Sequence, residues 1–377
     1  MPKECSRCLF TDDIGGVVIG PDGVCNYCKM HDRLEVMYPI CNKRLEKLVD
    51  DIRFDAHIHR RPYDCVIGVS GGADSSFLLR WAVESRLRVL AVHWDNGWNT
   101  PEAESNINVM VDSLGVDLIR YRATPEYHDL NKAFLMASVS EADVPNDIAL
   151  LSVILQTANR YGIKANLSGH VFREEGTCPT GWTFMDSRYI QDVYRWATGE
   201  EVESFPLMSL RQQVWWGLRG IKTFRPLYHI DYDKERVKED LHEDFGWTSY
   251  GAKHCENIYT AFVGSHLLPE KFHIDKRRIY YSALIRSEMM DKADAERLVA
   301  INVPFDSRYL SMVQDRYFED DETFDAVMRA PIKTHRDYGD YFKVFRRYKP
   351  FFWLGTKCNV FPRTFYEKYV LVGRDAR

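Results

Sequence analysis

The residues best suited to chemistry are a short serine- and glycine-rich segment, Ser70-Gly71-Gly72-Ala73-Asp74-Ser75-Ser76. It follows an apolar run that begins at Cys65 and precedes a second apolar run that begins at Phe77. A strand, a glycine turn and a helix start in that order build an anion site, because backbone N–H groups and hydroxyls converge there. The alternative is an incidental turn before a helix. We predict a phosphate-binding loop made by Ser70, Gly71, Gly72, Asp74, Ser75 and Ser76.

The loop differs from the commonest nucleotide-binding motif. A Walker A loop carries Gly-Lys-Ser/Thr after a longer glycine turn, and no lysine occupies that place between residues 70 and 76. The segment Ser-Gly-Gly-x-Asp-Ser directly after a strand resembles the signature of the PP-loop ATP pyrophosphatase superfamily. That resemblance implies an enzyme that cuts ATP between its α- and β-phosphates and passes AMP to a carbonyl oxygen.

Two Cys-x-x-Cys pairs stand near the amino terminus, with sixteen residues between them. This spacing is typical of a two-knuckle zinc site, in which four thiolates close a tetrahedron and leave no open position. A structural metal would also stabilise a segment too small to form its own core. An iron–sulfur cluster on the same ligands and four unrelated thiols are the alternatives. We predict that Zn²⁺ is held by Cys5, Cys8, Cys25 and Cys28.

The elements that position the loop alternate between strands and helices. Strands are expected at residues 64–70, 88–97, 117–121 and 164–169, with helices at 77–83, 100–114 and 147–161 between them. This alternation predicts an α/β fold with a doubly wound parallel sheet. Ligands lie at the carboxyl ends of such strands, so we expect three further residues at the nucleotide: His93, Asp95 and Gly169.

The remaining chain is less regular. Residues 177–225 are rich in tryptophan and are expected to form an irregular insertion that closes over the site. Polar residues 31–58 predict a linker helix, and helices are expected again at 232–245 and 291–299. We therefore predict three parts: a zinc knuckle with its linker helix (1–58), an ATP-binding α/β domain (59–230) and a mainly helical substrate or partner region (231–377).

A polar and basic block lies in the carboxyl-terminal half, with Lys253 and His254 at its start and Lys271 and Arg277 at its end. Such a block could bind an anionic substrate or a leaving group. From the pattern alone a solvated helix face is favoured over a binding site.

Taken together, the cysteine pairs, the loop at 68–76 and the block at 253–277 resemble the N-acetyl sugar amidotransferase family. Its members act in bacterial surface-polysaccharide (O-antigen) and nonulosonic acid pathways. The resemblance implies an adenine nucleotide alpha hydrolase-like fold, with ATP and Mg²⁺ used to adenylate a sugar acetamido oxygen. Ammonia then displaces AMP and leaves an acetamidino group. The resemblance also implies that the basic block contacts the sugar or nucleotide-sugar substrate. The implied catalytic residues are therefore Asp74, Lys253, His254, Lys271 and Arg277.

Ammonia needs a source. Position 2 is Pro, so there is no amino-terminal cysteine nucleophile, and no glycine-flanked cysteine elbow is visible. The resemblance implies separate subunits that supply ammonia, similar to the glutaminase and cyclase of histidine biosynthesis.

Bulk composition narrows the classes of function. The net charge of −5 argues against a nucleic-acid binder, and no segment has the apolar length of a membrane span or signal peptide. A cytoplasmic enzyme with reduced thiols is expected. One rival is a tRNA-modifying thiolase with the same loop and knuckles, which would need a basic surface and a sulfur-handling cysteine pair. The other is a non-catalytic zinc-knuckle module.

Overall fold

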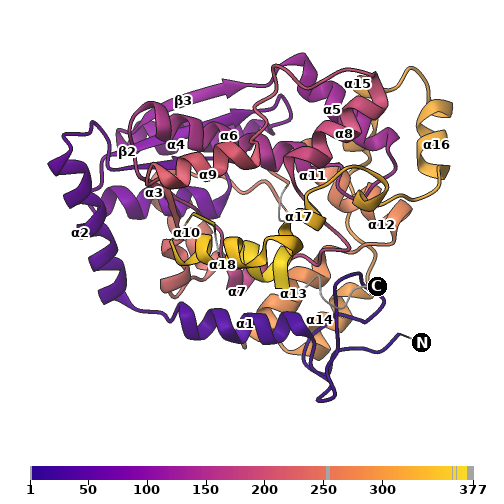
Figure 1. The fold of residues 1–377 in the computed structure, drawn as a ribbon, viewed down its shortest axis with the longest axis horizontal. Helices are drawn as coiled ribbons and strands as arrows, with labels where there is room; N and C mark the ends of the chain where they lie inside the picture. The colour runs from indigo at the N-terminus through magenta and orange to yellow at the C-terminus, as the bar shows by residue number, and fades with distance from the viewer. Residues whose placement is uncertain (1, 252–254, 359, 362, 372–377) are drawn as a thin grey trace.

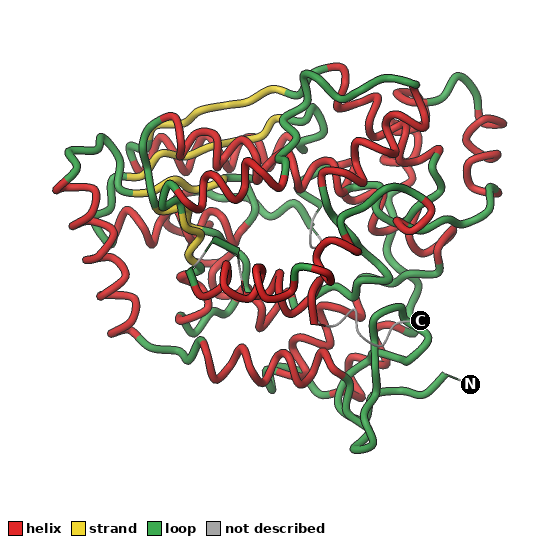
Figure 2. The backbone as a smooth tube through the Cα atoms, in the orientation of Figure 1, coloured by secondary structure: helices red, strands yellow, loops and turns green. Residues whose placement is uncertain are grey.

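The computed structural model describes residues 2–251, 255–358, 360–361 and 363–371 (Figure 1). Its centre is a five-stranded parallel sheet with the strand order β3-β2-β1-β4-β5. Figure 2 shows the strands gathered on one side of the molecule and helices over the remainder. The strands are β1 (Cys65–Gly68), β2 (Val89–Asp95), β3 (Asp117–Arg122), β4 (Ala165–Leu167) and β5 (Lys222–Phe224).

The helices of the first half surround this sheet. They are α1 (Asn26–Met37), α2 (Asn42–Ile58), α3 (Ala73–Glu84), α4 (Pro101–Leu114), α5 (Pro125–Met136), α6 (Val144–Arg160), α7 (Phe172–Glu175), α8 (Ser187–Thr198), α9 (Leu210–Leu218), the 3₁₀ turn η1 (Pro226–His229) and α10 (Lys234–Phe245).

The carboxyl-terminal part is mainly helical over its described length, as predicted. It comprises α11 (Ile258–Phe262), the π-helical η2 (Val263–Leu267), α12 (Leu268–Phe272), α13 (Arg277–Arg286), α14 (Lys292–Val299), α15 (Ser307–Tyr317), α16 (Asp321–Arg329), the 3₁₀ turn η3 (His335–Asp337), α17 (Phe342–Arg347), α18 (Lys349–Lys357), α19 (Arg363–Phe365) and the π-helical η4 (Tyr366–Leu371).

Both faces of the sheet are covered, because alternate residues of β1 enter different cores. Val66 belongs to a buried cluster that includes Ile154 of α6. Ile67 belongs to a second cluster, with Leu79 of α3 and Leu241 of α10. Strands buried on both faces read as continuous apolar runs rather than alternating ones, which is the pattern of β1 and β2. The predicted doubly wound parallel sheet is confirmed.

Two sequence expectations about the elements are wrong. Residues 177–225 are not irregular, since they contain α8, α9 and the edge strand β5. β5 has only three half-buried residues and pairs with β4 alone, so it leaves almost no periodic signal. The expected single helix at 31–58 is two helices, because Pro39 disfavours helical backbone at Tyr38, where α1 ends.

The boundary predicted at residue 230 stays a prediction. Val237 and Leu241 of α10 share their buried cluster with Ile67 of the sheet, so this helix packs on the α/β core. Within the described ranges, none of the helices combines the length and apolar character that a bilayer span requires.

One buried carboxylate connects α6 to the segment before α8. Glu141 is 3% exposed, and it accepts hydrogen bonds from the Phe184 amide at 3.2 Å and from the Tyr189 hydroxyl at 3.4 Å. Burial raises the pKa of Glu141 to about 7, against the smaller opposing effect of the charge on His335. The folded protein therefore holds a proton here that the unfolded chain has already released at the same pH.

We expect Glu141→Gln to remove a pH dependence of stability. Between pH 5 and pH 7 the unfolded state loses this proton first, so the wild-type free energy of unfolding should fall as pH rises. A pKa raised from 4.5 to about 7 corresponds to about 3 kcal/mol at pH 8. Urea unfolding at four pH values measures this free energy of unfolding, and Glu243→Gln, at an exposed position, is the control. Parallel pH profiles for wild type and Glu141→Gln would contradict this assignment.

Candidate active site and metal centre

The glycine loop is held by close backbone contacts. Gly71 has φ +78°, and a Cβ added there would lie 2.3 Å from the carbonyl oxygen of Ala103 in α4. Gly72 is the N-cap of α3 and has extended backbone. Because glycine offers no side chain to cap the helix, the N-cap itself occupies none of the N–H groups in the first turn of α3, and such groups can donate to a ligand. The local sequence thus produces the anion-binding geometry that it predicts.

Two serine hydroxyls hold the two ends of the loop together. Ser70 Oγ accepts from the Gly72 amide at 3.3 Å, and Ser75 Oγ donates to the Gly72 carbonyl at 3.1 Å. On the facing strand end, a Cβ on Gly169 would lie 3.2 Å from the Asp74 carbonyl oxygen, so β4 approaches the loop closely. Side chains are excluded from this approach, which keeps the backbone of the loop open toward the cavity described next.

The central cavity, as we call it, has a volume of about 1090 Å³ and opens over the loop. It lies at the carboxyl ends of β1 and β4, where the strand order reverses direction, which is where doubly wound sheets bind ligands. Of the residues predicted to bind the nucleotide, Ser70, Gly72, Asp74, Ser75 and Gly169 line it. Gly71 and Ser76 of the same loop were also predicted to bind the nucleotide, but they do not line the cavity.

The opposite wall of the central cavity comes from the carboxyl-terminal part of the chain. Figure 1 shows α17 and α18 in yellow across the middle of the molecule. Phe345 of α17, Phe361 and Tyr369 contribute aromatic rings, while Lys276 lies near the start of α13. One cavity therefore joins the phosphate-type loop to residues that are distant in sequence.

A charged pair at the cavity was missed from the sequence. Lys234 Nζ lies 2.7 Å from Asp74 Oδ2, and the Tyr232 hydroxyl donates to the other oxygen of Asp74. Burial opposes the charge of Lys234, but the neighbouring carboxylate outweighs it, and the pKa of Lys234 is raised. Asp233 signals a helix start by capping α10, yet nothing in the sequence places Lys234 beside the loop. Only the packing of α10 on α3 does so.

His93 and Asp95, predicted as nucleotide ligands, do not line the cavity, and only His93 bonds to the segment that leads into the loop. His93 Nε2 lies 2.8 Å from the Asn99 amide nitrogen, so it is the acceptor and Nδ1 carries the hydrogen. Nδ1 then donates to the Val69 carbonyl at 2.8 Å. Burial lowers the pKa of His93, which favours this neutral form. Asp95 accepts from the Gly97 amide at 3.1 Å in the turn after β2.

The basic block divides into different roles. Lys271 is buried and donates to the carbonyl groups of Val327, Met328 and Ala330 at the end of α16. Arg277 pairs with Asp275 at 2.8 Å and reaches carbonyls at the end of α14. Helix ends occupy donors of both side chains and neither lines the cavity, so their predicted contact with a substrate stays a prediction that the contacts here do not support. Lys253 and His254 lie outside the described residues.

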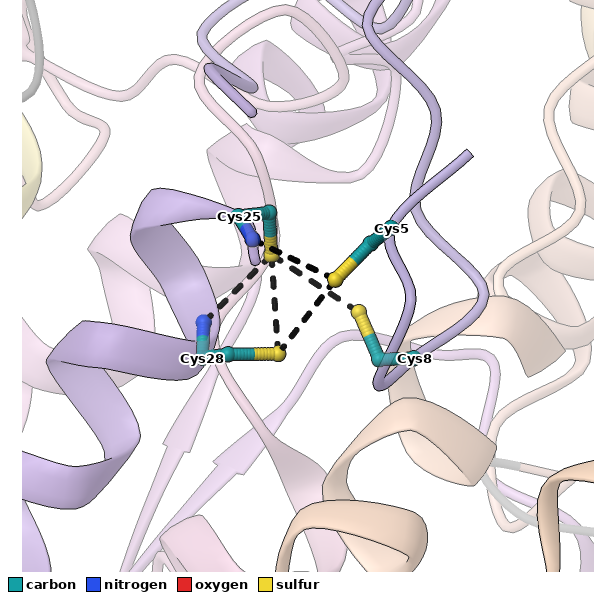
Figure 3. Close-up of side chains that lie close together, drawn as sticks. All are labelled: Cys5, Cys8, Cys25 and Cys28. Atoms are coloured by element: carbon teal, nitrogen blue, oxygen red, sulfur yellow. Dashed lines mark hydrogen bonds between the residues drawn. The ribbon is translucent and has the colours of Figure 1, made fainter. Parts of the chain in front are cut away.

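The cysteines predicted to bind zinc do come together (Figure 3). Their four sulfurs lie within 4.8 Å of one another, and all four side chains are fully buried. The Sγ–Sγ distances of 3.8 Å for Cys5–Cys28, 3.7 Å for Cys8–Cys25 and 3.6 Å for Cys25–Cys28 can be compared with a metal tetrahedron. Zn–S bonds of about 2.3 Å require sulfurs about 3.8 Å apart. The arrangement fits a four-thiolate metal centre.

Backbone and charge both favour thiolates at this centre. The amide of Cys25 donates to Cys5 Sγ at 3.2 Å, and the amide of Cys28 donates to Cys25 Sγ at 3.4 Å. Hydrogen bonds with Cys25 and Cys28 and the charge of Arg286 lower the pKa of Cys8, whereas hydrogen bonds within the cluster and burial raise the pKa of Cys28 against the same Arg286 charge. Since four protein ligands leave no open position, the centre is structural in type.

A parallel sheet in this strand order, with a glycine loop at its switch point, defines a doubly wound α/β protein of the nucleotide-binding type. Residues 256–349 match the family model described as "LPS biosynthesis protein WbpG-like, C-terminal domain". The match confirms, for this part of the chain, the resemblance to proteins of bacterial surface-polysaccharide biosynthesis. It begins at Glu256, two residues after His254, and includes Lys276 at the cavity.

Other comparisons are distant. NMN synthetase from Francisella tularensis has a TM-score of 0.32 and 13% identity, covering 77% of this chain and 97% of that one. NH₃-dependent NAD synthetase from Campylobacter jejuni subsp. jejuni also has a TM-score of 0.32, with 11% identity over 82% of this chain and 99% of that one. Likeness at this level carries no argument about this chain. Among curated proteins no match was found.

Gly71→Ala should disrupt the loop far more than Gly115→Ala. Both residues have positive φ, so both variants lose roughly 1 kcal/mol to left-handed backbone strain. Gly115 has open space around it, whereas a Cβ at Gly71 meets the backbone of Ala103. We expect pyrophosphate binding, measured by calorimetry, to weaken on the order of tenfold or more only for Gly71→Ala. Equal binding by both variants would show that the close approach to α4 is unimportant.

Proposed function

We propose that this protein is an ATP-dependent, AMP-forming amidotransferase that converts a sugar acetamido group into an acetamidino group. The observation that carries the proposal is the shared cavity. It is lined on one side by the glycine loop and on the other by Lys276, Ile279 and Tyr280 of the WbpG-like segment. A single cavity lined by both a phosphate-type loop and a segment of the surface-polysaccharide type suits the transfer of AMP from ATP to a sugar.

At the ATP end, N–H groups in the first turn of α3 and the hydroxyl of Ser70 offer donors to phosphate oxygens. Lys234 adds a positive charge at the same place. The Asp74 carboxylate is the cavity residue that would hold Mg²⁺, whose contribution when bound is to neutralise phosphate charge. Fixed donors of this kind stabilise the charge that develops as the bond between the α- and β-phosphates breaks.

At the acceptor end, the chemistry needs a carbonyl oxygen made into a leaving group. The amide oxygen attacks the α-phosphorus, the bond to the β-phosphate oxygen breaks, and pyrophosphate leaves. Ammonia then adds to the amide carbon, and AMP departs with the former amide oxygen while the nitrogen loses a proton. The volume of about 1090 Å³ exceeds that of most single-ligand pockets, so it accommodates a second substrate beside ATP.

The substrate and partners follow from the same proposal. A nucleotide sugar or sugar acid of lipopolysaccharide O-antigen or nonulosonic acid synthesis would be the acceptor, and a separate glutaminase with a cyclase-like subunit would supply ammonia. Sulfur transfer to tRNA is less favoured, because Cys178 is the one cysteine among the described cavity-lining residues. Thiolase chemistry would need a second sulfur there.

The proposal is tested with purified protein, ATP, Mg²⁺, an ammonium salt and candidate nucleotide sugars. We expect a product whose mass differs from the acceptor by replacement of one oxygen with NH, with AMP formed in equal amount. Glutamine without a partner subunit should not replace the ammonium salt. Formation of ADP instead of AMP would overturn the mechanism, and efficient use of glutamine by this chain alone would overturn the need for a partner.

Lys234→Met should reduce AMP formation strongly. Loss of one charge-assisted hydrogen bond removes about 1.5–3 kcal/mol, which corresponds to a fall in kcat/KM of roughly 10- to 100-fold. Lys238→Met is the matched control, since Lys238 is one turn further along α10, pairs with Glu235 and does not line the cavity. If the two variants had equal kcat/KM, Lys234 would have no role in the reaction.

A further inference from the structure

A buried arginine lies against the cysteine cluster. Arg286, the last residue of α13, is 3% exposed. Its Nη2 donates to Cys8 Sγ at 3.1 Å and its Nε to Cys28 Sγ at 3.3 Å. The guanidinium carbon also lies 4.8 Å from the centre of the Phe10 ring. The polar contacts of this side chain are thus directed to sulfur atoms.

A buried guanidinium requires a negative partner, because removing its charge from water costs several kcal/mol per ion. Among the residues that the structure describes, no carboxylate forms an ion pair with Arg286. The nearby acids serve other arginines, with Asp32 paired to Arg7 and Glu35 to Arg173. Neutral thiols could not balance the charge. Four thiolates around a divalent metal retain two negative charges, so a loaded centre supplies the counter-charge that Arg286 lacks otherwise.

Further contacts join the cysteine segment to α13 along its length. Arg278 Nη1 donates to the Leu9 carbonyl at 3.2 Å, and the Leu9 amide donates to Ser282 Oγ at 3.2 Å. Arg7 Nη2 donates to the carbonyl of Arg286 at 3.0 Å. Arg7, between the first two cysteines, and Leu9, directly after the second, are therefore hydrogen-bonded to three successive turns of this helix.

The other end of α13 belongs to the central cavity. Ile279 and Tyr280 in its first turn line that cavity, as does Lys276 directly before it. Gly176, also a lining residue, packs against the same turn, since a Cβ on it would lie 3.0 Å from the Ile279 carbonyl. One short helix thus has the metal-type cluster at its carboxyl end and the cavity at its amino end.

We propose that Arg286 is a positioning residue that couples metal loading of the cysteine cluster to the wall of the central cavity. With metal bound, the thiolate charge holds the guanidinium and keeps α13 packed against residues 5–10. Without metal, the buried charge loses its partner, α13 loosens, and the wall formed by Lys276, Ile279 and Tyr280 is displaced. The metal centre then supports the shape of the acceptor end of the cavity without contacting a substrate.

The first test is the rate of zinc transfer from the loaded full-length protein to a chromophoric chelator. Loss of a residue that hydrogen-bonds to metal ligands weakens metal sites about tenfold or more, so Arg286→Met should release zinc at least that much faster. Arg286→Lys keeps the charge and should lie between Arg286→Met and wild type. Release from Arg286→Met at the wild-type rate would overturn the proposal.

Lys271→Met controls for general loss of stability. Lys271 is a buried cation on α12 whose hydrogen bonds, within the described residues, go to carbonyl oxygens and not to the cysteines. Its substitution should lower the melting temperature while the zinc release rate stays at the wild-type value. If Lys271→Met accelerated release as much as Arg286→Met does, the effect would reflect global destabilisation and the proposal would fail.

A second measurement uses the wild-type chain and remains decisive if Arg286→Met does not fold. Hydrogen exchange is compared between zinc-loaded and chelator-treated protein. We expect faster exchange over residues 277–286 after zinc removal, with α3 and α10 unchanged. Unchanged exchange in α13, or equal acceleration in α3 and α10, would overturn the coupling. Neither measurement involves ATP or turnover. The coupling can therefore be wrong while the proposed reaction is right, and the reaction can be wrong while the coupling is right.

Discussion

The central constraint in this protein is that the backbone from Ser70 to Ser75 must stay uncovered at the carboxyl end of β1. A phosphate-type site made of N–H groups tolerates no side chain in its way, and the closest approaches of α4 and of the segment after β4 to the loop are made at glycines. Gly71 lies against α4, and Gly169 brings β4 against the Asp74 carbonyl. The reversal of strand order between β1 and β4 creates the space above the loop, and the carboxyl-terminal helices enclose it.

Buried positive charge is the second organising feature, and the partner of each cation decides its role. Lys234 is paired with Asp74 at the cavity, where its charge is available to a bound anion. Lys271 and Arg277 complete the carbonyl ends of α16 and α14 and so stabilise the helical region. Arg286 faces sulfur. Four cations that the sequence does not distinguish therefore have different roles, because at a buried site the nearest negative or carbonyl partner is the dominant interaction.

Short-range patterns were enough to predict much of the fold. β1 to β4, the helices α3, α4 and α6 and the cysteine cluster follow from local signals: apolar runs, a glycine turn, and paired Cys-x-x-Cys spacing, whereas α5 was not predicted. The elements that the sequence did not predict were missed for physical reasons. β5 is a three-residue edge strand, and α8 and α9 were hidden within an aromatic segment that reads as irregular. His93 and Asp95 do follow a strand that ends beside the loop, but their side chains bond backward to Val69 and to the turn after β2.

The sequence by itself determined the phosphate-type loop and the metal-type cluster, because each depends on motifs of a few residues, one in the loop and two in the cluster, whose geometry is set locally. Only the tertiary structure decided which side chains share the cavity with that loop. Lys234 reaches Asp74 across 160 positions, and Arg286 reaches Cys8 across 278. Contacts of that separation arise from how α10 and α13 pack, and packing depends on the whole set of buried surfaces. No local pattern of residue types encodes them.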